Sequence, residues 1–405
     1  MSRMSLPPPY DRLLVPIYLP SLLMAISNQG MILVLPLYAL HVSGDPAFAA
    51  LVVGLRGLGI LVFDIPAGML AARFGDKPVL LGGLLCNAIV MLALALASQP
   101  WLVAVLAIPQ GAGAAAWFLG RQSYVTDSSP PHEWGRAIAV MAGINRVGAF
   151  LGPLGGGIVA EWLGYSPAFA AGAALSAVAA LVALATARNV RPTLVDDAMK
   201  LSVIWRIVID NRRMFATAGF AGLAIQLMRA ARQLLVPLFG TLVGLDEAAI
   251  GLAYSLSAVL DMSLSYPAGI AMDRWGRKWT GIPCMLVFVA GLLLLPQARD
   301  FADLLVGSLV LGFANGLSTG IVMVLGMDLA PPEGRNHFLG VWRLIGDVGG
   351  VGGPLLAGVL AEAASLALAS VTVAGIGVVG ILIFALLVPE TKPGAREGAA
   401  PRARL

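Results

Sequence analysis

Nine ionisable side chains lie inside long apolar runs of this sequence, where charge is costly. They are Arg56, Asp64, Arg121, Arg146, Arg229, Arg232, Asp261, Arg343 and Asp347. Insertion scales assign about 2.5–3.5 kcal/mol to such a side chain at the centre of a membrane span, so most of the nine must pair or face water. Guanidinium and carboxylate groups at that depth can form ion pairs, bind a charged solute or, for carboxylates, carry protons. The elements that carry these residues determine which of these roles is available.

The apolar runs predict twelve membrane-spanning helices. Of 405 residues, 59% are hydrophobic and 12% charged, whereas a soluble domain is about half apolar and a quarter charged. A helix needs about 20 mostly apolar residues to cross the hydrocarbon core. The runs are 13–40, 49–71, 78–98, 101–124, 137–160, 167–187, 215–240, 249–271, 280–296, 304–328, 338–361 and 366–388. They lack the alternation of a membrane barrel, so we expect an all-α membrane protein whose first run is an uncleaved span.

Lysine and arginine are distributed unequally between the loops. With the N-terminus inside, the cytoplasmic segments hold 19 of the 26 basic residues, and the outer loops hold only Arg299. Cytoplasmic loops of membrane proteins are rich in Lys and Arg, so both termini are predicted to be cytoplasmic. The net charge of +4 is then an orientation signal, and no nucleic-acid partner is expected. Arginine exceeds lysine by 22 to 4, which favours a GC-rich bacterial source and therefore the inner membrane.

The two halves of the chain resemble each other at a constant offset of 201 residues. Pro66-Ala67-Gly68 matches Pro267-Ala268-Gly269, Asp127 matches Asp328, and Gly152-Pro153 matches Gly353-Pro354. The predicted organisation is an N-terminal six-helix bundle (1–187), a cytoplasmic linker (188–214), a C-terminal six-helix bundle (215–389) and a cytoplasmic tail (390–405). Two like-oriented halves around a cavity are the architecture of an alternating-access carrier.

Three motifs resemble the major facilitator superfamily, over essentially the whole chain, and its 12-span drug/proton antiporter-like group in particular. Gly68–Lys77 and its repeat Gly269–Lys278 resemble the family's cytoplasmic loop GxxxDRxGRK, and Gln110–Ala115 resembles its QGxGAA segment. The set Gly148, Gly152, Pro153, Gly156 and Gly157 matches the core of the antiporter motif. The resemblance implies the major facilitator fold, two pseudo-symmetric bundles of six helices. The motif glycines have two possible roles, close helix packing and restriction of leakage.

The sequence departs from the family pattern at two positions. The first loop has Ala72 where the motif has Asp, while the second loop keeps Asp273. The fourth span has Ala107 where the family often places an Arg that is linked to proton coupling.

The intramembrane charges and the loop motifs provide candidates for gating or proton coupling. They are Arg56, Asp64, Arg73, Asp127, Arg146, Asp261, Asp273, Arg274, Asp328, Arg343 and Asp347. Arg73 and Arg274 are each expected to pair with the Asp of their own half, and the alternative is ordinary interfacial charge. The helix packing of the family implies two pairs between the halves, Arg146–Asp261 and Arg56–Asp347. These pairs are gates or static scaffold, and Asp64 and Asp261 are also candidates for proton carrying.

A second set of residues is predicted to bind the solute. It comprises Asn28, Gln110, Trp117, Arg121, Gln226, Arg229, Arg232 and Asn315. The grouping rests on helical spacing and on the family resemblance, which implies that spans 1, 4, 7 and 10 line the cavity. Packing is an equal alternative for Trp117 and Asn28. The excess of arginine predicts a positive field and hence an anionic or zwitterionic solute.

The leading functional hypothesis is a secondary active transporter, with proton-coupled export of a small organic solute or drug. The alternatives are proton-coupled uptake or facilitated diffusion of an organic anion, and a non-transporting membrane receptor. An enzyme is not expected, because no Ser/His/Asp, paired-carboxylate or metal-ligand constellation is present. The expected partners are the solute, the proton and the lipid bilayer. No cofactor is expected, and the protein is expected to act as a monomer.

Overall fold

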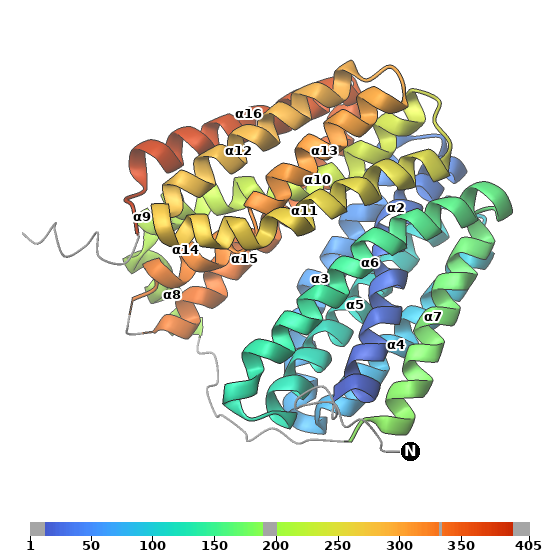
Figure 1. Cartoon of the computed structure of the whole chain (residues 1–405), viewed down its shortest axis with the longest axis horizontal. Coiled ribbons are helices and arrows are strands. Elements are labelled where there is room, and N and C mark those ends of the chain that lie inside the picture. The colour runs from blue at the N-terminus through green and yellow to red at the C-terminus, as the bar shows by residue number, and fades with distance from the viewer. Residues whose placement is uncertain (1–12, 189–200, 332–333, 392–405) are drawn as a thin grey trace, which may run out of the picture. The chain divides into compact units, whose positions relative to one another are not determined.

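The structure is a computed structural model that describes residues 13–188, 201–331 and 334–391. Within these ranges the ordered elements are helices, joined by short loops (Figure 1). Helices suit an apolar surrounding because each satisfies its backbone hydrogen bonds internally.

The first half contains six long helices. They are α2 (Leu19–Ser43), α3 (Pro46–Phe74), α4 (Asp76–Leu96), α5 (Pro100–Ser128), α6 (Trp134–Leu163) and α7 (Tyr165–Thr186). Two short elements accompany them, the π-helical turn η1 (Leu14–Tyr18) before α2 and the 3₁₀ turn η2 (Pro131–Glu133) before α6. Asp45 caps α3, because its side chain accepts a hydrogen bond of 2.8 Å from the backbone N–H of Ala47.

The second half repeats this pattern with more interruptions. Its elements are α8 (Leu201–Asp210), α9 (Arg212–Met214), η3 (Phe215–Gly219), α10 (Phe220–Leu242), α11 (Glu247–Trp275), α12 (Arg277–Leu294), η4 (Leu295–Gln297), α13 (Phe301–Leu317), α14 (Ile321–Leu329), α15 (Arg335–Ala363) and α16 (Leu366–Leu387). The helix α8 was not predicted separately, because it lies within the polar linker. Its buried Ile207 joins a hydrophobic cluster with Phe215, Phe338 and Trp342.

Twelve helical stretches of the described chain are long and apolar enough to cross a membrane, which confirms the predicted number of spans. Their ends differ from the predicted runs by a few residues. The first stretch, for example, covers Leu14–Ser43 and the last covers Leu366–Leu387.

The chain divides into two compact units, residues 1–196 with 240–258 and residues 197–239 with 259–405. In the first unit, α2 packs against α6 and α7, and α5 packs against α3 and α4. In the second, α12 packs against α13 and α16. The predicted linker and tail fall partly on 189–200 and 392–405, outside the described residues, so the predicted domain limits stay a prediction.

The 201-residue offset is visible in the backbone. The π-helical turn η1 begins at Leu14 and its counterpart η3 begins at Phe215. Gly75 and Gly276 occupy equivalent positions before α4 and α12, with φ of +90° and +109°. Residues that carry a side chain rarely adopt this backbone conformation, so glycine is required at both turns.

The tenth span breaks the symmetry. This span consists of two helices: α13 ends at Leu317 and α14 begins at Ile321, with Gly320 at a φ of +82° between them. Its repeat equivalent, α5, is continuous from Pro100 to Ser128. At the break the carbonyl of Ser318 accepts from the N–H of Ile321, three residues on, and also from Arg229 of α10.

Candidate solute-binding site

A cavity of about 510 Å³ lies in the second unit among α10, α14 and α15. Its mainly apolar lining includes Met323, and Gln226, Arg229, Arg343 and Asp347 are among its polar residues. Pockets of about 300–1,000 Å³ accommodate drug-sized molecules. Two of these residues were predicted to bind solute and two to gate, and the structure places all four around one cavity.

Arg229 is held by the interrupted part of the tenth span. The Nη2 atom of Arg229 donates to the hydroxyl of Ser318 and, at 3.3 Å, to its carbonyl oxygen. The Nε of Arg229 and the Oε1 of Gln226 are both buried and have no hydrogen-bond partner. Buried polar atoms are nearly always paired in proteins. Two side chains that line this cavity therefore carry an unpaired donor and an unpaired acceptor in their buried parts.

Arg343 and Asp347 form an ion pair along α15. The Nε of Arg343 lies 3.7 Å from Oδ2 of Asp347, one helical turn away. Both side chains are partly exposed, at 55% and 37%. Asp347 was predicted to pair with Arg56, and that prediction stays untested.

Asn315, Asp261 and Arg232 lie around the α13 side of the same unit. The Nδ2 of Asn315 donates to Oδ2 of Asp261, which also interacts electrostatically with Arg229. Arg232 is only 6% exposed, and its Nη1 donates to the carbonyl of Leu311 at 3.1 Å. The guanidinium of Arg232 thus contacts the backbone of α13 and is not among the residues that line the cavity.

In the first unit, Arg56 links two residues that were predicted to bind solute. Its Nε donates to Gln110 at 2.6 Å, and its Nη2 donates to Asn28 at 2.8 Å. Gln110 in turn donates to Asn87 of α4 at 3.3 Å. The structure therefore unites residues from four spans in one polar cluster. Asn87 was not singled out, although an isolated amide in an apolar span was a usable signal.

Trp117 and Arg121 share one face of α5. Trp117 is 4% exposed and belongs to a core cluster with Tyr18, Met24 and Leu80, which is the packing alternative considered for it. The guanidinium of Arg121 lies 5.8 Å from the Trp117 ring and 5.3 Å from the Phe118 ring. Arg121 is 6% exposed, so aromatic faces replace much of its hydration.

The loop after α11 is held by Arg277. Its Nε lies 2.7 Å from Oδ2 of Asp328, and its Nη1 lies 3.7 Å from Oδ1 of Asp273. The carboxylate of Glu390 accepts hydrogen bonds from the backbone N–H groups of Arg277 and Lys278. Arg277 was not predicted to have a role, although it is part of the loop motif, and the predicted pairing of Arg274 with Asp328 stays a prediction.

The corresponding loop of the first unit is different. Asp76 stands at the repeat position of Arg277 and is fully buried, with Ser123 and Asp127 of α5 beside its carboxylate. The Arg73 guanidinium lies 5.4 Å from the ring of Phe74. Asp127 is exposed at the end of α5, and Asp64 and Arg146 are half-buried on α3 and α6.

The family model of the Major Facilitator Superfamily matches residues 17–230 and 220–403 of this sequence. The chain belongs to the Major Facilitator Superfamily. Membership in this family of transporters confirms the resemblance and the fold that the loop motifs predicted, and it makes the chain an integral multi-pass membrane protein.

Similar proteins include the multidrug resistance protein MdtH from two organisms. The protein of Photorhabdus laumondii is 28% identical over 344 residues, which cover 78% of this chain and 79% of that relative. The protein of Yersinia pestis is 28% identical over 332 residues, again covering 78% and 79%.

Two solved structures share the major facilitator fold. A bacterial homologue of the human lysosomal transporter Spinster has a TM-score of 0.75 at 16% identity, covering 93% of this chain and 97% of that chain. The nucleoside transporter NupG has a TM-score of 0.72 at 15% identity, covering 91% and 97%. At these identities the likeness shows the fold.

In this major facilitator protein, the glycines of the antiporter motif bring helices close together. A Cβ on Gly148 would lie 2.5 Å from Cβ of Ala25, and one on Gly152 would lie 2.6 Å from the backbone N of Gly30, both on α2. A Cβ on Gly157 would lie 2.4 Å from the carbonyl of Glu247 at the start of α11. These glycines therefore allow α6 to pack closely against α2 and against the start of α11, which is the packing role considered for the motif.

Proposed function

We propose that this chain is a secondary active transporter that works by alternating access and exports a small anionic or zwitterionic organic solute or drug in exchange for protons. The observation that carries the proposal is that Gln226, Arg229 and Arg343 line one cavity of the second unit.

The charges at this cavity favour the proposed substrate class. Arg229 and Arg343 contribute two guanidinium groups, whereas Asp347 contributes one carboxylate. Guanidinium binds carboxylate and phosphate through paired hydrogen bonds. The carbonyl of Gln226 accepts a hydrogen bond and suits the ammonium group of a zwitterion.

Export and proton exchange are supported by the antiporter motif and by the MdtH relatives, whose name describes multidrug resistance. We propose that the protein is a monomer in the bacterial inner membrane. Its termini would both be cytoplasmic, as the basic loops predict. The carboxylates of Asp64 and Asp261 are the proton-carrying candidates. No cofactor and no enzymatic step enter this mechanism.

Facilitated diffusion or uptake of an organic anion is a second candidate. It is favoured by Ala107, which occupies the position where the family often has a proton-coupling arginine.

Transport into proteoliposomes separates these functions. Candidate organic acids, amphiphiles and antibiotics are first ranked by the thermal shift of the purified protein. The flux of the best ligand is then measured under an imposed pH gradient of either direction.

Exchange predicts solute accumulation on the acidic side, because protons leaving that side drive solute into it. Facilitated diffusion predicts equilibration that does not depend on the gradient, and uptake coupled to protons predicts accumulation on the alkaline side. Binding without flux would indicate a receptor and overturn transport.

The matched variants are Arg229→Gln and Arg299→Gln. Both remove one positive charge, but Arg299 is exposed in the loop before α13, away from the cavity. Arg229→Gln should abolish flux at normal protein level, and Arg299→Gln should not. Wild-type flux in Arg229→Gln would refute the site.

A further inference from the structure

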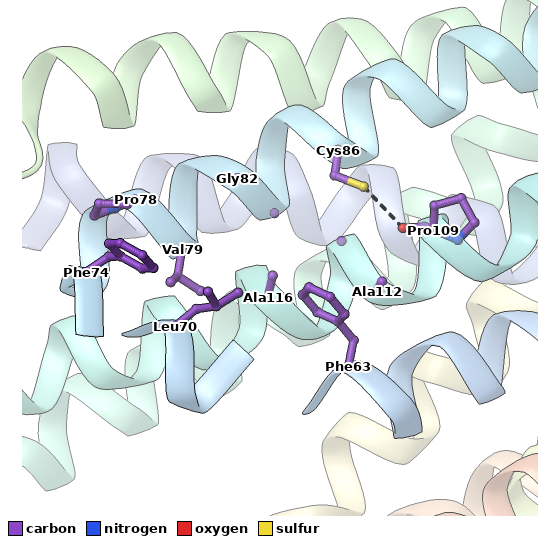
Figure 2. A pocket seen from close by; sticks show the side chains of 12 residues that line it. Phe63, Leu70, Phe74, Pro78, Val79, Gly82, Cys86, Pro109, Ala112 and Ala116 are labelled. Atoms are coloured by element: carbon purple, nitrogen blue, oxygen red, sulfur yellow. Dashed lines mark hydrogen bonds between the residues drawn. The ribbon is translucent and has the colours of Figure 1, made fainter. Parts of the chain in front are cut away.

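A second cavity, of about 440 Å³, lies in the first unit between α3, α4 and α5. Figure 2 shows Phe63 and Leu70 on one side of it and Ala112 and Ala116 on another. Among the lining residues only Cys86 has a polar side-chain atom, and its thiol contacts the carbonyl of Pro109 at 3.3 Å. The cavity is therefore apolar along its whole length.

Glycines explain how the hollow forms. A Cβ on Gly83 would lie 2.4 Å from the backbone N of Trp117, so Gly83 allows α4 and α5 to touch. The neighbouring Gly82 has no atom within 4 Å of a Cβ built on it. The absent side chain of Gly82 thus leaves open space beside a tight helix contact.

The hollow is accessible from outside the protein. Phe74 and Leu70, which line it, are 51% and 37% exposed. Leu70 belongs to the span Pro46–Ala71, whose surroundings in the membrane are hydrocarbon, and Phe74 lies just beyond its end on the same helix. An empty apolar void loses dispersion contacts, so a hydrocarbon chain entering it would be favoured.

Two cationic residues are neighbours in the chain of lining residues at one end of the cavity. Arg73 lies beside Phe74, with its guanidinium 5.4 Å from the ring that lines the cavity. Lys77 precedes the lining residue Pro78, and its Nζ donates to the carbonyl of Leu184 at 2.8 Å. Both residues lie near the turn that joins α3 and α4. This end of the cavity therefore lies at the membrane interface, where basic residues attract anionic lipid.

We propose that this cavity binds one acyl chain of an anionic phospholipid, whose headgroup phosphate is held by Arg73 and Lys77. This cavity belongs to the first unit, whereas the candidate solute site belongs to the second. An acyl chain matches the apolar lining, and the phosphate matches the cations at its interfacial end.

Native mass spectrometry of the purified full-length protein tests this proposal. The probes are phosphatidylglycerol and phosphatidylcholine with identical acyl chains, titrated separately. The wild type should bind one phosphatidylglycerol more tightly than phosphatidylcholine. Gly82→Leu should remove that binding, because the new side chain fills the cavity. Gly375→Leu is the matched control, since Gly375 is exposed on α16 and likewise has no atom within 4 Å of a Cβ.

The headgroup contact is tested by replacing Arg73 and Lys77 together with Gln. About fivefold is expected for each basic residue near a charged lipid surface, so the affinity for phosphatidylglycerol should fall about 30-fold. Arg136→Gln, at an exposed site on α6, should leave the affinity unchanged. Equal affinity of the wild type for the two lipids, or of the double variant and the wild type for phosphatidylglycerol, would overturn the proposal.

A photoreactive phosphatidylglycerol with a diazirine in its acyl chain gives a readout that needs no variant. Crosslinks on residues 63–116 support the site. Crosslinks confined to other helices, or undiminished binding in Gly82→Leu, contradict it.

Discussion

Arg277 Nε lies 2.7 Å from the carboxylate of Asp328, whereas the repeat position of Arg277 in the first half is occupied by Asp76. The second half therefore joins the loop after α11 to the end of α14 by an ion pair. Thr391 adds a hydrogen bond of 2.9 Å to the same carboxylate. The first half has a buried carboxylate at that place.

Replacing Arg277 by Gln should destabilise the protein. The change removes a charge-assisted hydrogen bond from a guanidinium that is 6% exposed, and such bonds contribute about 1.5–3 kcal/mol. The melting temperature in detergent should fall by several degrees. Arg335→Gln, at an exposed site on α15, is the control and should melt as the wild type does. An unchanged melting temperature in Arg277→Gln would show that the pair contributes nothing to stability.

Replacing Asp76 by Asn should have the opposite effect. The carboxylate of Asp76 is fully buried beside Ser123 and the like-charged Asp127, and an incompletely satisfied buried group costs about 1–3 kcal/mol, more when charged. The amide keeps the volume and removes the charge, so the melting temperature should rise. Asp210→Asn, at an exposed position, gives the baseline. A lower melting temperature in Asp76→Asn would mean that the carboxylate has a stabilising partner.

Replacing Gln226 by Leu should separate stability from binding. The buried Oε1 of Gln226 lacks a partner, so an apolar side chain of similar size should leave stability equal or higher. Loss of one hydrogen bond should weaken solute binding about threefold to tenfold. Thermal melting and isothermal titration with the solute found in the ligand screen measure the two effects. Unchanged affinity would remove Gln226 from the site.

Replacing Gly152 by Ala should weaken the contact between α6 and α2. The new Cβ would lie 2.6 Å from the backbone N of Gly30, and overpacking of this kind costs about 1–3 kcal/mol. Gly155→Ala is the control on the same helix, because no atom lies within 4 Å of a Cβ at Gly155. Equal melting temperatures for the two variants would contradict the close packing.

The spans were predictable from the sequence because twenty apolar residues in a row have few alternatives to a membrane helix. The cavity residues Gln226 and Arg229 were also predictable, since residues three positions apart share a helix face. The hydrogen bonds of Arg56 to Asn28 and Gln110 were not, because they depend on which helices are neighbours in space.

The ion pair of Arg277 with Asp328 was not predicted, for a local reason. Gly276, with a φ of +109°, turns the chain between α11 and α12. Helical phase cannot be extrapolated across that turn, so the position of Arg277 depended on backbone geometry. The predicted pairing of Arg274 with Asp328 stays a prediction. The predicted pairs Arg146–Asp261 and Arg56–Asp347 stay predictions.

The interruption between α13 and α14 divides the tenth span into two helices. Arg229 donates hydrogen bonds to both the hydroxyl and the carbonyl of Ser318 at this break. An anion that binds Nη2 of Arg229 would compete with these two hydrogen bonds. We expect such a ligand to weaken the contact between α10 and the break, and so to let α14 move relative to α13.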